Sequence, residues 1–392
     1  MRKKLWLGLL LLGMTACQLS AEKEVAVPLK EVDMHADYPM RQLDIGELAE
    51  VTYLPLDIKL NSKDRSYHNT FIGSISESHI VSHTFDGDVE VFDHAGERLH
   101  HFNHQQKEKE GSYMGIGALL TDEKNGEIWI LDYDLSFKVY TMDGTYRRKL
   151  KLPASMNAEV VKNWSADSLL CYDDHLVSEG LSKNPHPFYL FSKKDGGIRK
   201  LTSYRVPNRI SHSERFVLNL GGMNPVLHFT ISTSPLAVGG GRAVLAEYAQ
   251  DTVFCLEQGK VSPLFVRKPS VFASLPFVLG SADFVTSRYL FFGFTEKSRT
   301  HRFYRDLLYD FETGEVCTYQ LQNHDFEPWL SVPVQMWRAD WPSNWLVSEM
   351  TIDKFLQYHR EGKLKGKAAE IAAKLKSTDT SVLIIYKFHD KK

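Results

Sequence analysis

A repeated stretch at residues 128–150, IWILDYDLSFKVYTMDGTYRRKL, decides the fold of this 392-residue chain. Two alternating apolar runs flank a short polar corner, and the second run reaches Gly144 before a third begins. Residues 80–102, IVSHTFDGDVEVFDHAGERLHHF, align with this stretch without a gap at an offset of 48, so that Gly96 falls on Gly144. A repeat of this length, made of short strands and glycine turns, is typical of a β-propeller blade.

The same unit recurs along the chain. Five glycines follow alternating runs, and a tight hairpin at each would need the positive φ that glycine adopts freely. The intervals between them are 48, 52, 63 and 55 residues, each long enough for four strands and their loops. The glycines and the runs before them are Gly96 after residues 89–92, Gly144 after 137–140, Gly196 after 188–191, Gly259 after 252–256 and Gly314 after 307–311.

The two ends of the chain predict how the ring closes. Residues 381–388, SVLIIYKF, form a sixth run with no strand after it, and residues 51–56, VTYLPL, form a strand before the first repeat. If these two pair, the last blade is complete and the ring has no exposed edge. We therefore expect an all-β fold, a six-bladed β-propeller closed by an N-terminal strand, in one domain of residues 41–392.

One segment interrupts the strand pattern in the last blade. At about residues 351–377, apolar side chains recur at intervals of three and four, which predicts a helical insertion. Gly362 and Gly366 divide it into two helical pieces. The insertion either packs over one end of the ring or forms a lid over the central funnel.

The N-terminus predicts export and a lipid anchor. Three basic residues precede the apolar run of residues 5–13, which is too short to span a bilayer. Met14-Thr15-Ala16-Cys17 follows directly and resembles the bacterial lipobox. That resemblance implies a signal peptide of residues 1–16, a lipid on Cys17 and, with Gln18 next, a place in the outer membrane. An ordinary secretory signal is the alternative, and residues 17–40 are expected to form a flexible tether.

Composition limits the partners. With 43% apolar and 12% aromatic residues the chain suits a β-rich globule. Without Arg2, Lys3 and Lys4, 44 basic residues remain against 49 acidic ones, which argues against a nucleic-acid partner. The remaining cysteines, Cys171, Cys255 and Cys317, lie in apolar runs and are expected to be buried free thiols.

Four segments resemble a known family, the six-bladed β-propeller lipoproteins of Bacteroidetes-type bacteria. They are residues 43–49 (LDIGELA), 53–56 (YLPL), 248–254 (YAQDTVF) and 382–387 (VLIIYK). The resemblance spans about residues 41–388 and implies the propeller fold and a place in the cell envelope. Where the family usually carries a G-x-G-P-G-E-Y loop, this chain has KEGSY at residues 109–113.

The best candidate for a ligand site is the tryptophan-rich stretch at residues 323–345. A tryptophan ring can cover the apolar face of a sugar while charged groups bind its hydroxyls. The alternative is a long inter-blade loop held by its own aromatic residues. The candidate ligand-binding residues are Trp329, Trp337, Arg338, Asp340 and Trp341.

The sequence contains no clear motif for catalysis or for cofactor binding. The glycines at residues 111–117 have the wrong spacing for dinucleotide binding, and no nucleophile elbow or zinc-protease motif occurs. We predict no cofactor, no catalytic residue and no metal site, although the histidines at residues 79–104 leave metal binding open. Two carboxylate pairs, Asp86 with Asp88 and Asp132 with Asp134, occupy equivalent corners of the first two repeats, where turn-amide binding and acid–base catalysis are the two interpretations.

Two functions remain. The first is a monomeric, lipid-anchored binding or scaffold protein whose partner is a glycan, a peptide or another envelope component. The second is an enzyme of the glycoside hydrolase or polysaccharide lyase type in the funnel. Apolar or small side chains lining the channel would favour binding, and convergent acidic and basic residues would favour catalysis.

Overall fold

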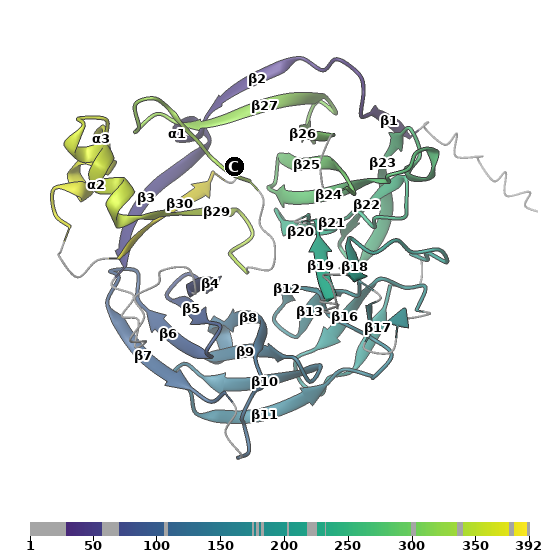
Figure 1. Cartoon of the computed structure of the whole chain (residues 1–392), viewed down its shortest axis with the longest axis horizontal. Helices are drawn as coiled ribbons and strands as arrows, with labels where there is room; N and C mark the ends of the chain where they lie inside the picture. The colour runs from purple at the N-terminus through teal and green to yellow at the C-terminus, as the bar shows by residue number, and fades with distance from the viewer. Residues whose placement is uncertain are drawn as a thin grey trace, which may run out of the picture.

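The computed structural model shows six sheets arranged radially around a central axis (Figure 1). It describes residues 29–56, 70–105, 109–174, 176–177, 180–181, 184–201, 204–217, 226–231, 233–298, 303–334, 340–375 and 380–389. Cys17 therefore lies outside the described residues. The predicted six-bladed β-propeller is confirmed.

The first three blades are four-stranded antiparallel sheets whose first strand is innermost. In blade 1 the strands are β4 (Thr70–Ile75), β5 (Ile80–Thr84), β6 (Asp88–Phe92) and β7 (Arg98–Asn103). In blade 2 they are β8 (Ile116–Asp122), β9 (Glu127–Asp132), β10 (Ser136–Thr141) and β11 (Tyr146–Lys151), with the 3₁₀ helix η2 (Glu123–Asn125) after β8. In blade 3 they are β12 (Val160–Ser165), β13 (Ser168–Tyr172), β16 (Phe188–Ser192) and β17 (Ile198–Lys200).

Two small hairpins leave the third blade. They are β14 (Leu176–Val177) with β15 (Gly180–Leu181), and β18 (Ser213–Val217) with β19 (Val226–Thr230). The second hairpin, β18 with β19, lies between Gly196 and Gly259 and explains why that interval is the longest of the four.

The fourth and fifth blades each gain an additional outer strand from the N-terminal segment. Blade 4 contains β20 (Leu236–Gly239), β21 (Arg242–Leu245), β22 (Thr252–Glu257) and β23 (Lys260–Lys268), followed by the 3₁₀ helix η3 (Val271–Ala273). Blade 5 contains β24 (Val278–Val285), β25 (Tyr289–Glu296), β26 (Tyr304–Asp310) and β27 (Val316–Asn323), with the short β28 (Leu330–Ser331) beside β27. The added strands are β1 (Lys30–Asp33), parallel to β23, and β2 (Met40–Asp44), parallel to β27.

The N-terminal tether is therefore shorter than the sequence suggested. Residues 17–40 were expected to be a flexible tether, yet β1 lies within them. Val32 of β1 is fully buried in an apolar cluster formed with residues of blades 4 and 5. Four residues are too few for an alternating pattern to stand out. The pairing partner of β1 also lies more than two hundred residues away.

The sixth blade closes the ring as predicted. It contains β29 (Trp345–Thr351), β30 (Ser381–Phe388) and the N-terminal β3 (Ala49–Leu56), which pairs with β30 in antiparallel register from Ala49↔Phe388 to Leu56↔Ser381. The N-terminal segment thus runs along the outside of blades 4, 5 and 6 in turn, as the purple ribbon shows (Figure 1). The short helix α1 (Ile45–Leu48) connects β2 to β3.

The helical insertion lies between β29 and β30, and its division into two pieces is confirmed. Helix α2 (Ile352–Arg360) begins at an N-cap where Thr351 Oγ1 accepts from the Lys354 amide, and α3 (Gly366–Ala372) follows. Phe355 and Ala368 bury the helices against the outside of the sixth blade (Figure 1). Among the described residues, no helix combines the length and hydropathy needed to cross a membrane.

The core lies between the blades, where apolar faces of neighbouring sheets meet. Cys171, Cys255 and Cys317 are buried free thiols within these faces, as predicted. All five repeat glycines adopt a positive φ in the turn that joins the third strand of a blade to the fourth. The first strand of each blade lies nearest the central axis, so the side chains that line the channel come from these strands and the residues next to them.

Candidate functional site

The first strands converge on a cavity at one mouth of the central channel. It encloses about 330 Å³, within the range of small-ligand sites. All six blades contribute to its wall, through residues 75–77, 121–123, 162–166 with Lys193, 236–238, 283–284 and 340–343. We call this cavity the channel mouth.

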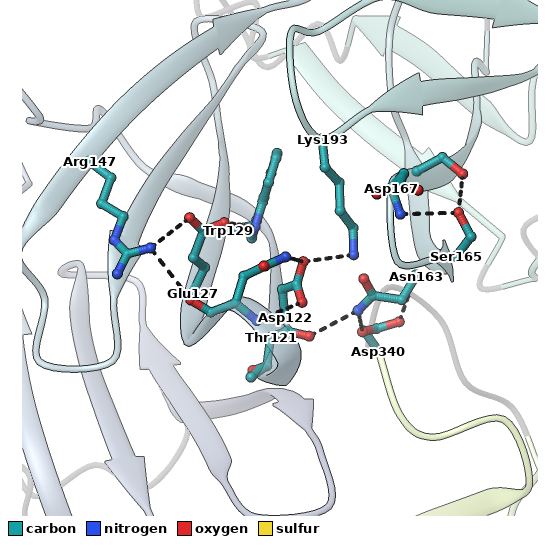
Figure 2. A network of polar contacts seen from close by, with 12 residues as sticks. Thr121, Asp122, Glu127, Trp129, Arg147, Asn163, Ser165, Asp167, Lys193 and Asp340 are labelled. Carbon is teal, nitrogen blue, oxygen red and sulfur yellow. Dashed lines mark hydrogen bonds and ion pairs between the residues drawn. The ribbon is translucent and has the colours of Figure 1, made fainter.

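Asp340 lies at the innermost position of the sixth blade. Its amide donates to the Gly73 carbonyl at 3.2 Å, and its carbonyl accepts from the Ile75 amide at 2.9 Å. Its carboxylate reaches the third blade, where it accepts from the Asn163 amide at 3.2 Å and from Asn163 Nδ2 at 2.5 Å (Figure 2). Asn163 Nδ2 also donates to the Thr121 carbonyl at 3.1 Å, so these contacts join four blades.

A buried ion pair joins the second blade to the third at the same level. Lys193 Nζ lies 3.0 Å from Asp122 Oδ2, and both side chains are buried (Figure 2). Asp122 also caps η2 by accepting from the Asn125 amide at 3.4 Å, and it accepts from Asn125 Nδ2 at 3.0 Å. Although burial opposes its ionisation, the hydrogen bonds from Asn125 and Lys193 hold the pKa of Asp122 below its usual value.

Lys162 is the second buried cation of the channel mouth, with 7% of the residue exposed. Burial lowers the pKa of its ammonium group, and the Asp340 carboxylate offsets part of that effect. Burial likewise raises the pKa of Asp340, against the opposing influence of Lys162 and Asn163. The two side chains are thus electrostatically coupled across the channel.

Asp283 is a third buried carboxyl group of the channel mouth. It is the extra residue at a β-bulge in β24, and it accepts from Ser281 Oγ at 3.0 Å. Burial first, and the nearby Asp306 second, raise the pKa of Asp283 to about 8. This carboxyl group is therefore protonated at neutral pH and can donate a hydrogen bond.

One polar atom of the cavity wall is left without a partner. The Thr121 hydroxyl is buried and makes no hydrogen bond to any described residue, while the residue itself lines the channel mouth. A buried hydroxyl without a partner is unfavourable, so a polar ligand that bonded to it would gain affinity.

The rim combines aromatic rings with an excess of acidic groups. Trp164 and Trp341 are half-buried on opposite blades, the third and the sixth. Five carboxyl groups line the described part of the channel mouth against two ammonium groups: Glu77, Asp122, Glu123, Asp283 and Asp340 against Lys162 and Lys193. The lining thus suits a neutral or cationic ligand better than an anionic one.

The structure places only some of the sequence-based candidate residues at the channel mouth. Asp340 and Trp341 lie together at the channel mouth. Trp329 does not: it lies at the outer edge of blade 5, stacked on His324 with ring centroids 4.1 Å apart. Trp337 and Arg338 fall outside the described residues.

The sequence reasoning missed Lys162, Asn163, Lys193 and Asp283. Lys162 and Asp283 each interrupt an apolar first strand, within VVKNW and SADFV, and that interruption was the available signal. It becomes informative once the strand is known to be the innermost of its blade.

The corner aspartates of the second repeat have a structural role. Asp132 accepts from the amides of Met114 and Gly115 at 2.8 and 3.2 Å and forms an ion pair with Lys138. Its carboxylate is fully committed to these contacts. Turn-amide binding, the first of the two interpretations, is therefore confirmed for Asp132.

The histidines of the first blade are likewise engaged. His79 Nδ1 lies 2.9 Å from Glu123 Oε1, and His101 Nε2 lies 2.9 Å from Asp88 Oδ1. Within the described ranges, no three His, Cys, Asp or Glu side chains are grouped as a metal site would require.

Comparison with known proteins identifies the fold and no family. No protein-family model matches the chain, and no curated protein matches its sequence. Among solved structures, a "putative exported protein" of Bacteroides fragilis matches with a TM-score of 0.55 and 12% identity, covering 90% of this chain and all of that one. The chain is thus a six-bladed β-propeller similar in fold to that protein.

Two further structures resemble the chain more weakly. BamB of Moraxella catarrhalis matches with a TM-score of 0.36 and 8% identity, over 87% of this chain and 99% of that one. The Pan2 WD40 domain of Neurospora crassa matches with a TM-score of 0.41 and 9% identity, over 87% and 97% of the two chains. At these TM-scores neither similarity bears on function.

Proposed function

We propose that this protein is an exported, lipid-anchored β-propeller of the outer membrane that binds a ligand at its channel mouth. The channel mouth carries the proposal: a 330 Å³ cavity whose wall holds a buried Thr121 hydroxyl without a hydrogen-bond partner. The anchor rests on the lipobox-like residues 14–17 and on the resemblance to propeller lipoproteins of Bacteroidetes-type bacteria.

The wall carries the convergent acidic and basic residues that were expected to favour catalysis, but the contacts of two of its carboxylates support binding instead. The carboxylate of Asp122 is committed to Lys193 of the neighbouring blade, and that of Asp340 to Asn163 of the opposite blade, so both contacts hold blades together. Trp164 and Trp341 offer rings for the apolar face of a ligand. A segment of a neutral or amino-bearing glycan, or a basic peptide side chain, fits this combination.

Ligand binding is tested with the soluble chain from residue 18 onward. Thermal unfolding is measured with glycans, peptidoglycan fragments and peptides, because a ligand of the folded state at about a hundredfold above its Kd stabilises by about 2.7 kcal/mol. The shift should disappear in Trp164→Ala and Trp341→Ala and persist in Trp329→Ala, the matched tryptophan outside the channel mouth. A ligand whose effect survives both channel variants would exclude the channel mouth as its site.

The anchor is tested separately. Wild-type protein should incorporate labelled palmitate and partition into detergent, whereas Cys17→Ala should do neither. Equal labelling of the two would exclude Cys17 as the modified residue.

One observation favours a second function, cleavage of a polysaccharide in the channel. Asp283 presents a protonated carboxyl group at neutral pH, which is what a general acid requires. Turnover of an envelope polysaccharide that is lost in Asp283→Asn, with folding and ligand binding retained, would establish the enzyme. Equal turnover in the variant would remove Asp283 from that role.

A further inference from the structure

Two equivalent turns on neighbouring blades present the same pair of side chains. In blade 1 the Gly87 amide donates to the Thr84 carbonyl at 3.1 Å, and in blade 2 the Leu135 amide donates to the Asp132 carbonyl at 3.0 Å. Phe85 and Tyr133 occupy the second position of these turns, and Asp86 and Asp134 the third. The fourth residues, Gly87 and Leu135, have φ of 80° and 57°. Such a conformation is uncommon for leucine, so the turn shape is maintained without glycine.

The rings of Phe85 and Tyr133 are exposed to solvent on one side and pack against other residues on the other side. Phe85 is 64% exposed and Tyr133 61% exposed. Phe85 packs edge-on against Phe71, with centroids 4.8 Å apart. The Tyr133 ring lies on Gly115, where an added Cβ would come within 2.4 Å of it, so the absence of a side chain there lets the ring lie close to the backbone.

The link between blades 1 and 2 brings the two turns together. Gln105 lies against Gly87 of the first turn and donates through Nε2 to the Met114 carbonyl at 2.9 Å. The Met114 amide in turn donates to Asp132 of the second turn at 2.8 Å, and the Met114 side chain is exposed. We call this surface, made of the rings of Phe71, Phe85 and Tyr133 and the side chain of Met114, the aromatic platform.

The aromatic platform lies on the face of the ring opposite the channel mouth. The first strands end at the channel mouth, at Ile75 and Asp122, and the second strands run back from it. The two turns follow the second strands β5 and β9, so they project from the other face. This surface is therefore separate from the proposed ligand site of the channel.

We propose that the aromatic platform is a second binding site, for a linear neutral glycan. Phe85 and Tyr133 stack on the apolar faces of two sugar units, and the exposed carboxylate of Asp86 accepts hydrogen bonds from their hydroxyls. Asp134 is instead held by Lys149, whose Nζ lies 2.6 Å from its Oδ2. A linear glycan repeats one chemical unit, as the two turns repeat one arrangement. The exposed carboxylate of Asp86 beside the Phe85 ring is unfavourable for an anionic bilayer surface or an acidic polymer.

The test is isothermal titration calorimetry of the soluble chain with the hexasaccharides of cellulose, chitin, starch and mannan and with the matching disaccharides. At least one hexasaccharide should bind with a Kd of about 1 mM or lower. It should bind at least about tenfold more tightly than its disaccharide, because the two subsites act together. Phe85→Ala and Tyr133→Ala should each weaken binding about tenfold, and the double variant should abolish it.

Three control variants test whether glycan binding depends on the aromatic platform. Tyr133→Phe keeps the ring and should retain binding. Phe272→Ala removes a ring that is 56% exposed on η3, outside the aromatic platform, and should bind as the wild type does. Trp341→Ala tests the channel mouth and should also bind normally.

Other results would overturn the proposal. One is the absence of binding by all four hexasaccharides. A second is binding that survives in the Phe85→Ala/Tyr133→Ala/Trp341→Ala variant, in which the channel mouth is also altered, or that disappears in Trp341→Ala alone. A third is platform-dependent binding confined to anionic phospholipid vesicles or to peptides.

Discussion

Asp340 of the sixth blade accepts two hydrogen bonds from Asn163 of the third blade at the centre of the ring. The backbone of Asp340 is at the same time bonded to Gly73 and Ile75 of the first blade. A side chain near the axis can contact blades that are not neighbours around the ring, so one residue here connects three blades. The contact also places a carboxylate beside the buried Lys162.

Replacing Asp340 should therefore destabilise the protein. Asp340→Asn removes the negative charge that faces Lys162, and we expect a loss of about 3 kcal/mol, typical of a broken buried pair. The double variant Asp340→Asn/Lys162→Met should be more stable than the sum of the single effects by about 1 kcal/mol or more. Urea denaturation at pH 7 measures both, with the exposed Asp167→Asn as the control. Strict additivity would show that the two side chains are not coupled.

The protonated state of Asp283 should make stability depend on pH. Its pKa is raised to about 8 in the folded protein, so the folded state holds a proton that the unfolded state releases at acidic pH. Its contribution is fully present below the usual aspartate pKa and is lost as the pH rises towards 8. Asp283→Asn cannot ionise, so between pH 5 and 9 it should lose about 4 kcal/mol less stability than the wild type. Parallel pH profiles for the two proteins would show that Asp283 has an ordinary pKa.

The fold was predictable because its signals are local. An alternating third strand and the glycine that follows it lie within a few residues of each other, and five such pairs mark five of the six blades. Closure was also predictable, because β30 and β3 are long apolar runs left without partners. β1 gave no such signal, since its four residues become a strand through pairing with β23.

The site was less predictable because its residues depend on radial position. Trp329 and Trp341 belong to one tryptophan-rich stretch, yet one lies at the outer edge of blade 5 and the other at the channel mouth. Local sequence does not distinguish these positions. Lys162 and Asp283 matter because β12 and β24 are innermost, which the sequence reasoning did not use.

Trp329 should prove dispensable for ligand binding at the channel mouth. It is 49% exposed and stacks on His324, whose Nδ1 lies 2.8 Å from Asp44 Oδ2. Trp329→Ala should leave the affinity of any channel ligand unchanged and reduce stability by about 1 kcal/mol or less. Calorimetric titration beside Trp341→Ala gives the comparison. A loss of affinity in Trp329→Ala equal to that in Trp341→Ala would contradict the placement of the ligand at the channel mouth.

Gly96 should be essential to the seam at which the ring closes, that is, the contact between the β6–β7 turn of blade 1 and β3 of blade 6. It lies in the turn between β6 and β7 with φ of 81°, and an added Cβ would come within 2.3 Å of the Pro55 carbonyl oxygen in β3. Gly259 occupies the equivalent turn of blade 4 with φ of 78° and has no atom within 4 Å of such a Cβ. Gly259→Ala should thus cost about 1 kcal/mol from backbone strain alone. Gly96→Ala should cost about 3 kcal/mol, because the closing strand must also move. Urea denaturation of the two variants separates these contributions, and equal losses would show that the seam adapts without cost.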